Sequence, residues 1–176
     1  FLVMGYRILG VDPGSRYTGW AILDLPSFGR PFELLSCGLI DVKNEKFPYN
    51  LSKLYSELKE IAVEYSPDIM SLESVFSGIN PSSLIKLSQA RGVICMLSSD
   101  LNIKLREYPP RLVKKSIAGS GSADKDRMKE ALKIICSSSN VYGVSEFLKG
   151  KINDNISDAL AIAICCATDM KNFINA

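Results

Sequence analysis

The chain has 176 residues, of which 47% are hydrophobic and 23% are charged. These proportions are typical of one ordinary globular domain, and they exclude an intrinsically disordered chain. The net charge is only +2, so it says little about binding partners. Histidine is absent, which excludes Ser-His-Asp triads, Cys-His nucleophiles and histidine-bearing zinc sites. Hydrolytic chemistry would therefore have to rely on carboxylates, lysines or a bound metal ion.

Several features bear on the compartment. The longest strongly apolar stretch without a charge, 159–167, is far shorter than the roughly 20 residues that span a bilayer. No signal peptide is recognisable, and five irregularly spaced cysteines fit reduced thiols better than a disulfide framework. We therefore expect a cytoplasmic protein without membrane contact. Residues 1–3 precede the first methionine, Met4, and are expected to be a cloning remnant before a single domain over 4–176.

Three short strands are predicted near the N-terminus. The first, 6–12, is an apolar run that ends in Asp12, directly before Pro-Gly. The second and third are 17–24 and 32–42, and turn residues separate each strand from the next. Short connections of this kind favour an antiparallel meander.

The pattern then alternates between helix and strand. Apolar spacings of three and four residues, with proline and Asn/Ser/Asp caps, mark the helices. The predicted segments are helix 51–65, strand 68–73, helix 80–97, strand 103–107, helix 109–117, helix 123–135 with Ser122 as its cap, a loop or short helix over 136–149, and a helix from Asn153 or Asp154 to Ala167. Helical crossovers imply parallel strands. The prediction is an α/β fold with a mixed five-stranded sheet, antiparallel hairpin strands plus parallel strands, flanked by helices.

Three acidic residues stand where a sheet would gather them. Asp12 ends the first strand, Glu73 ends the fourth, and Asp158 lies in the first two turns of the last helix. Such an oxygen cluster suits Mg²⁺, and two such ions can hydrolyse a phosphodiester. Each acid also has an ordinary explanation. Asp12 suits a turn, Glu73 a solvated strand end, and Asp158 a favourable contact with the helix dipole.

A set of motifs in fixed order resembles the RuvC family of Holliday junction resolvases. The motifs are Ile8-Leu-Gly-Val-Asp-Pro-Gly-Ser15 with Thr18-Gly-Trp-Ala21, Leu72-Glu-Ser-Val-Phe76, Gln89-Ala-Arg-Gly92, Gly119-Ser-Gly-Ser-Ala-Asp-Lys125 and Asp158-Ala-Leu-Ala-Ile-Ala163. The resemblance implies a ribonuclease-H-like fold, a homodimer, and paired nicks in four-way junction DNA during recombination and repair. It also implies two Mg²⁺ ions per active site, with Mn²⁺ as a substitute. The family's catalytic, metal-binding acids match Asp12, Glu73 and Asp158.

The sequence departs from the family pattern at Asn155. The family has Asp-x-x-Asp-Ala-Leu-Ala, whereas this chain has Asn155-Ile-Ser-Asp158-Ala-Leu-Ala. A fourth catalytic and metal-binding carboxylate is therefore an amide, which offers a carbonyl oxygen without a charge. Asp154 is adjacent but about 100° further around the helix, so we do not expect it to substitute. Two explanations stay open: an engineered inactivating change, favoured by the otherwise intact motifs, or a natural protein that cuts poorly.

Basic residues gather in one part of the chain. The segment 101–133 holds nine basic and four acidic residues, a net charge of +5, which leaves −3 for the rest. Such a bias suits a face that contacts phosphates. The resemblance marks Lys114 and Lys125 as DNA-binding, and it marks Phe76 as a residue that stacks on junction bases. Lys129 and Lys133 are more simply explained as part of a solvated helix face.

Two other functions compete with an active nuclease. Asn155 favours a non-catalytic junction-binding protein as the alternative to an active nuclease. An ATPase of the actin and sugar-kinase type needs a second duplicated domain, for which 176 residues leave no room. The helix over 80–97 is the candidate dimer interface, because a two-fold junction calls for a two-fold dimer. Contact with a branch-migration helicase complex is a further expected partnership.

Overall fold

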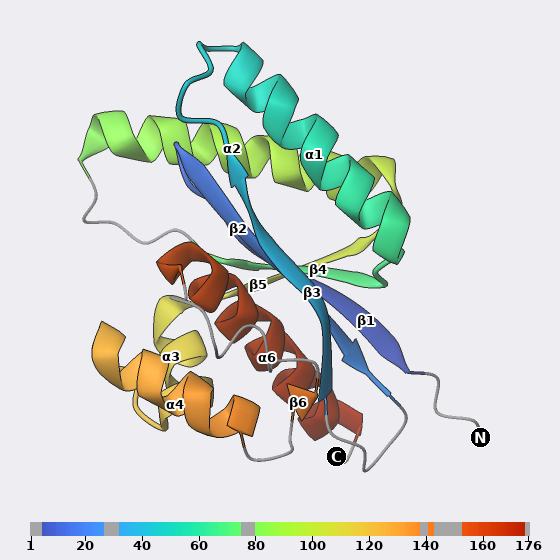
Figure 1. Cartoon of the computed structure of the whole chain (residues 1–176), viewed down its shortest axis with the longest axis vertical. Coiled ribbons are helices and arrows are strands. Elements are labelled where there is room, and N and C mark those ends of the chain that lie inside the picture. Colours follow the sequence, from blue (N-terminus) through green and yellow to red (C-terminus); the bar gives the residue numbers. More distant parts are fainter. Residues whose placement is uncertain (1–4, 27–31, 75–79, 138–140, 143–152, 175–176) are drawn as a thin grey trace.

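A mixed β-sheet separates two layers of helices in the computed structural model (Figure 1). The structure describes residues 5–26, 32–74, 80–137, 141–142 and 153–174. The strands lie in the order β5-β4-β1-β2-β3-β6. Their bounds are β1 (Tyr6–Asp12), β2 (Tyr17–Leu25), β3 (Phe32–Asp41), β4 (Ile69–Glu73), β5 (Lys104–Tyr108) and β6 (Val141–Tyr142).

The five predicted strands are confirmed, including their directions. β1, β2 and β3 form the antiparallel meander, while β4 pairs parallel to β1 and β5 parallel to β4. The sheet gains a sixth strand, β6, whose two residues pair parallel with Phe32 and Glu33 of β3. The prediction of a loop or short helix over 136–149 missed this pair, because two residues carry no periodicity. Residues 138–140 and 143–149 lie outside the described part of the chain.

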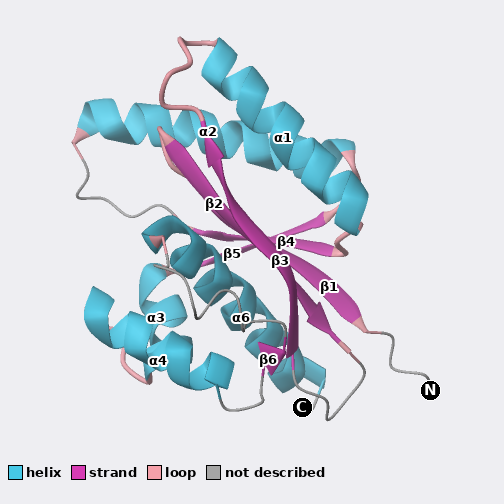
Figure 2. Ribbon diagram, viewed as in Figure 1, coloured by secondary structure: helices cyan, strands magenta, loops and turns pink. Residues whose placement is uncertain are grey.

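Helices cover both faces of the sheet, as Figure 2 shows. One face carries α1 (Tyr49–Tyr65) and α2 (Pro81–Asp100), and the other carries α6 (Asp154–Ile174) with α3 (Pro110–Ala118) and α4 (Lys125–Ser137) outside it. The predicted cap of α2 is confirmed, since the Asn80 side chain accepts a hydrogen bond from Ser82 N at 2.9 Å. None of the helices in the described residues is long and apolar enough to cross a membrane.

Two helix starts refine the prediction. Ser122 is not the cap of α4: the carboxylate of Asp124 accepts from Arg127 N at 2.8 Å, and the helix begins at Lys125. Aspartate caps as well as serine does, and both precede the apolar pattern, so the sequence did not separate them. At α6 the choice falls on Asn153, whose side chain accepts from Asn155 N at 2.9 Å.

Close packing of α6 on the sheet depends on two glycines. A Cβ on Gly10 would lie 2.3 Å from the carbonyl oxygen of Ala159, and a Cβ on Gly19 would lie 2.0 Å from that of Asn155. Only glycine allows the helix backbone to approach the strands this closely. The almost fully buried run from Ala159 to Ala167 then fills the core on this face. The start of α6 is thereby fixed against β1 and β2.

Candidate active site

The sheet and α6 bring Asp12 beside the first turn of that helix. Asp12 is the last residue of β1 and pairs across the ladder with Gly19 of β2. Gly19 is also the residue against which the main chain of Asn155 packs. The end of β1 and the start of α6 are therefore neighbours, although about 140 residues separate them in the sequence.

Glu73 reaches the same edge of the sheet by strand pairing. β4 runs parallel to β1, with Leu72 opposite Val11. Asp12 and Glu73 each follow this pair by one residue, so both acids stand at the carboxyl ends of adjacent parallel strands. Open α/β sheets bind ligands at this edge.

The three carboxyl groups lie close enough to influence one another. The pKa of Asp12 is raised to about 8, mainly by burial and then by the charges of Asp158 and Glu73, while Lys125 lowers it. Burial and then Asp158 raise the pKa of Glu73 above its usual value. Asp158 is an exposed residue by surface area, yet the protein atoms around its carboxyl group still raise its pKa. Three acids of elevated pKa at one sheet edge are typical of a functional site.

A cavity of about 190 Å³ lies beside these acids. Its charged lining residues come from four elements: Glu73 of β4, Lys114 of α3, Lys125 and Lys129 of α4, and Asp154 and Asp158 of α6, together with Asp124. A larger hollow of about 500 Å³ lies between α1, α2 and the turn after β1, and it includes none of the three acids. Size alone is therefore a poor guide here, and the smaller cavity is the candidate site because Glu73 and Asp158 line it.

Carboxylate oxygens around a partly open cavity fit a hard divalent cation such as Mg²⁺. In the described residues, no three His, Cys, Asp or Glu side chains are grouped closely enough to hold a metal ion on their own. Mg²⁺ commonly takes one or two carboxylates and completes its shell with water and substrate phosphate oxygens. The donor set therefore fits a metal shared with a phosphate better than a closed protein cage.

Asn155 and Asp154 take different roles at the start of α6. The side-chain amide of Asn155 donates to Asn153 Oδ1 at 3.2 Å. Asp154 lines the cavity, but it is engaged by Lys129 at 2.6 Å and Lys125 at 3.6 Å. The hydrogen bond from Lys129 holds the pKa of Asp154 below its usual value. The acid that could replace a carboxylate at 155 is thus already paired with two lysines.

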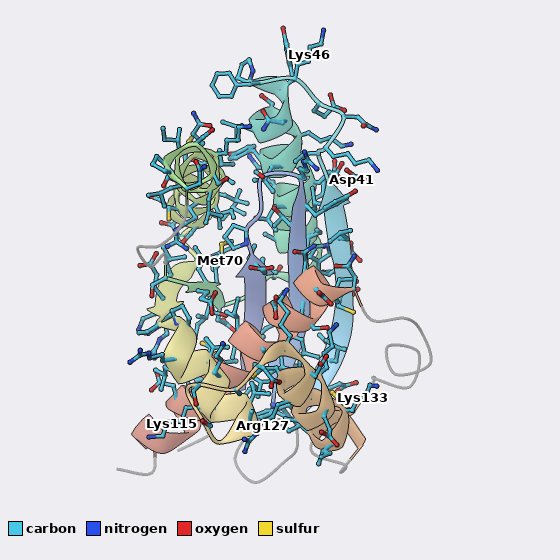
Figure 3. All side chains as sticks on the ribbon, turned by 90° about the vertical axis from the view of Figure 1, so that its left-hand side faces the viewer. Asp41, Lys46, Met70, Lys115, Arg127 and Lys133 are labelled. Carbon is cyan, nitrogen blue, oxygen red and sulfur yellow. The ribbon has the colours of Figure 1, made fainter. Side chains whose placement is uncertain are left out.

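The predicted phosphate-binding lysines differ in their surroundings. Figure 3 shows the side chains of this part of the molecule, with Lys115 of α3 and Arg127 of α4 labelled. Lys114 is half-buried in the cavity and lowers the pKa of both Glu73 and Asp158. Lys125 is the first residue of α4, and its side chain is 78% exposed. Phe76, the predicted stacking residue, lies outside the described residues.

Two residues make contacts that the sequence does not predict. Lys129 is partly exposed, as predicted for a solvated helix face, but it also forms the closest ion pair of the cavity. Arg91 of α2 donates from Nη1 to the main-chain carbonyl of Glu73, a contact that no local pattern signals. Its place in Gln89-Ala-Arg-Gly92 was the only available hint.

Known proteins match almost the whole chain. The family model for crossover junction endodeoxyribonuclease RuvC matches residues 8–166. The chain belongs to the RuvC family. This RuvC-family chain is 36% identical to the crossover junction endodeoxyribonuclease RuvC of Photobacterium profundum, over 95% of its own length and 90% of the relative. It is 39% identical to the protein of that name from Mannheimia succiniciproducens, over 89% of its own length and 73% of the relative.

Solved RuvC structures confirm the fold. T. thermophilus RuvC in complex with a Holliday junction substrate superposes with a TM-score of 0.82, at 20% identity over 96% of each chain. The ribonuclease-H-like architecture predicted for this RuvC-family chain is therefore correct, and so is the family resemblance carried by its motifs. The match covers the segments that hold all three acids.

Proposed function

We propose that this RuvC-family chain is a divalent-ion-dependent endonuclease that resolves four-way DNA junctions by paired nicks in recombination and repair. One observation carries the proposal: Glu73 and Asp158 line a cavity together with Lys114 and Lys125, and Asp12 lies close enough to Glu73, Asp158 and Lys125 for their charges to shift its pKa. Acids that hold a metal, beside bases that hold a phosphate, are what phosphodiester hydrolysis requires. Three carboxylates alone would repel a DNA strand.

Each side chain has a role in this proposal. Asp12, Glu73 and Asp158, with the side-chain oxygen of Asn155, would hold two Mg²⁺ ions, and Mn²⁺ would substitute. The bound ions would lower the pKa of the attacking water and stabilise the leaving oxygen. Lys114 and Lys125 bind the phosphate and orient it, and Phe76 stacks on a base at the junction centre.

A nicking assay on a synthetic four-way junction tests the proposal. The purified chain is incubated with the labelled junction in Mg²⁺, in Mn²⁺ and in EDTA, beside a linear duplex of the same sequence. We expect paired nicks in the junction that need a divalent ion, and no nicks in the duplex. Cleavage in EDTA, or equal cleavage of the duplex, would contradict the proposal.

Asn155 favours one alternative, a junction-binding protein that does not cut. In that case the chain would bind the junction as tightly as an active enzyme but would give no nicks in either Mg²⁺ or Mn²⁺. Binding without cleavage would support this alternative. Failure to bind the junction would contradict both.

Lys114 and Lys125 are expected to set the salt dependence of junction binding. The double variant Lys114→Ala with Lys125→Ala should lower the affinity for the junction. It should also reduce the slope of log Kd against log salt by about 2, because a chain that has lost two phosphate contacts releases fewer counterions on binding. The matched control is Lys53→Ala with Lys59→Ala, which removes the same charge from α1 on the other face of the sheet. An unchanged slope in the cavity variant would refute the phosphate contacts. Titrations between about 50 and 200 mM salt measure it.

α2 supports a homodimer as the acting form. Its outer surface carries Ile85 and Met96, which are 60% and 61% exposed, with Gly92 between them at helical spacing. Gly92 is exposed, and a Cβ there would meet nothing within 4 Å. Glycine inside a helix costs about 1 kcal/mol relative to alanine, and no contact of the described residues requires it here. We therefore propose that a second copy of α2 crosses at Gly92.

Gly92→Glu should convert the dimer to a monomer while leaving the fold intact. The charged side chain has open space on the surface of a single chain, but it would have no space between two α2 helices that cross at this position. Sedimentation at micromolar concentration measures the change. Val63→Glu is the control, since Val63 is 61% exposed on α1, outside the proposed interface. A monomeric parent chain, or an unchanged dimer in Gly92→Glu, would contradict the α2 interface.

A further inference from the structure

Arg91 links α2 to the ends of two neighbouring strands. Its Nη1 donates to the main-chain carbonyl of Glu73 at the end of β4, and its Nη2 pairs with the carboxylate of Glu107 in β5. The Arg91 side chain is only 12% exposed. A guanidinium that is mostly withdrawn from water and has two fixed acceptors is costly to displace, because the groups around it exclude the water that would otherwise solvate its charge.

The contact acts on the main chain at the candidate site. Glu73 is the last residue of β4, and Ser74, the last described residue before 75–79, donates from its N–H to Tyr108 O at 2.8 Å. The ends of strands open more readily than their centres. The bond from Arg91 fixes the peptide that carries the Glu73 carboxyl group, so it limits where that group points.

The positive charge of Arg91 also supports the Glu73 carboxylate. The Arg91 guanidinium is hydrogen-bonded to the Glu73 main chain, so its charge lies close to the residue whose carboxylate lines the cavity. Arg91 is absent from the lining of the cavity that holds Glu73 and Asp158. It can therefore support the carboxylate without competing for the ligand that the cavity binds.

We propose that Arg91 is the positioning residue for Glu73: it fixes the end of β4 so that the Glu73 carboxylate stays beside Asp158. Arg91 also precedes Gly92, where the second copy of α2 is proposed to cross. The same helix turn thus ties the candidate dimer contact to the candidate site.

The test compares Arg91→Met and Arg91→Lys with Arg106→Met. Arg106 is the matched control, because it pairs with Asp169 at 2.8 Å and is 27% exposed but does not contact Glu73. Hydrogen exchange of the Ser74 amide reports on the strand end. Calorimetric titration of the junction complex with Ca²⁺, used here as a non-cleaving ion, reports on the carboxylates.

In Arg91→Met we expect Ser74 exchange to be about tenfold faster than in the parent chain, with Val11 exchange unchanged. We expect Ca²⁺ affinity to fall about tenfold, as for other residues that orient metal ligands. Junction affinity in EDTA should change less than twofold, and Arg91→Lys should recover part of both losses. Arg106→Met should leave all three values unchanged.

A purely structural role gives a different result. If Arg91→Met lowers the melting temperature but leaves Ser74 exchange and Ca²⁺ affinity at the parent values, the positioning role is wrong. If Arg91→Met does not fold, Arg91→Lys decides by the same two measurements. The Ca²⁺ result rests on the proposed function, whereas Ser74 exchange does not. A parent chain that binds no divalent ion would therefore refute the proposed function and leave the Arg91 contact to be judged by exchange.

Discussion

Asn155→Asp is expected to raise Mg²⁺-dependent nicking of a four-way junction by roughly 100-fold or more, which corresponds to about 2.7 kcal/mol of activation free energy. Two Mg²⁺ ions carry four positive charges, whereas Asp12, Glu73 and Asp158 supply three negative ones. A carboxylate at 155 lies one helical turn before Asp158, in the helix start whose main chain packs against Gly19 beside the end of β1. It would supply the missing charge where the ions are shared with the phosphate.

Junction affinity should change little in the same variant. Binding depends mainly on Lys114, Lys125 and stacking by Phe76, none of which is altered. The added negative charge would, if anything, weaken binding slightly. Single-turnover nicking with saturating enzyme separates the chemical step from binding.

Asp154→Asn is the matched control, since it changes a neighbouring acid on the same helix turn. Asp154 is held by Lys129 and Lys125, so its loss should free these lysines and leave the divalent-ion affinity close to that of the parent. If Asp154→Asn instead abolishes ion binding, and Asn155→Asp cuts no faster than the parent, then Asp154 already supplies the fourth carboxylate. That pair of results would overturn the role assigned to Asn155.

The sequence predicted the strands of this fold because their pattern is local. Asp12 and Glu73 could be placed at strand ends from apolar runs that stop at an acid. Their meeting with Asp158 followed from the order of the strands and from the motif resemblance. The two-residue β6 could not be predicted, because its pairing with Phe32 and Glu33 is a tertiary contact without a periodic signal.

The side-chain partners were less predictable than the backbone. Helical spacing shows that Asp154 and Asp158 are about 40° apart around the helix, so both can face one cavity. Spacing cannot show that Lys129, on another helix, reaches Asp154. The contact from Arg91 to the Glu73 carbonyl likewise depends on how α2 crosses the sheet. Charge pairing between elements is a property of the assembled fold, which one sequence without its structure does not specify.

Asp12→Asn is expected to abolish divalent-ion-dependent cleavage and to stabilise the metal-free protein. The pKa of Asp12 is about 8 in the folded chain and 3.8 as its ordinary value. An acid whose folded pKa is raised costs stability as the pH rises, because the unfolded chain releases a proton that the folded chain retains. The loss begins above pH 3.8 and is complete above about pH 8. At 1.36 kcal/mol per pKa unit, the upper limit of this cost is about 5–6 kcal/mol.

The variant therefore changes stability in a pH-dependent way. In EDTA, Asp12→Asn should melt several degrees above the parent at pH 8, and the difference should vanish near pH 4. Thr18→Ser, a conservative change at a buried position of β2 nearby, is a control whose effect on the melting temperature should not vary with pH. Thermal melts across this range, with cleavage assays at pH 8, measure both effects.

If Asp12→Asn is no more stable than the parent at pH 8, the folded site does not strain this carboxylate. Cation binding would then stabilise the folded chain only through its own binding free energy, because there would be no destabilised Asp12 carboxylate for the cation to relieve. If the variant is stabilised and inactive, the ionised Asp12 carboxylate lowers the free energy of unfolding of the metal-free chain. That loss is expected of a site whose acids are arranged to bind a positive charge.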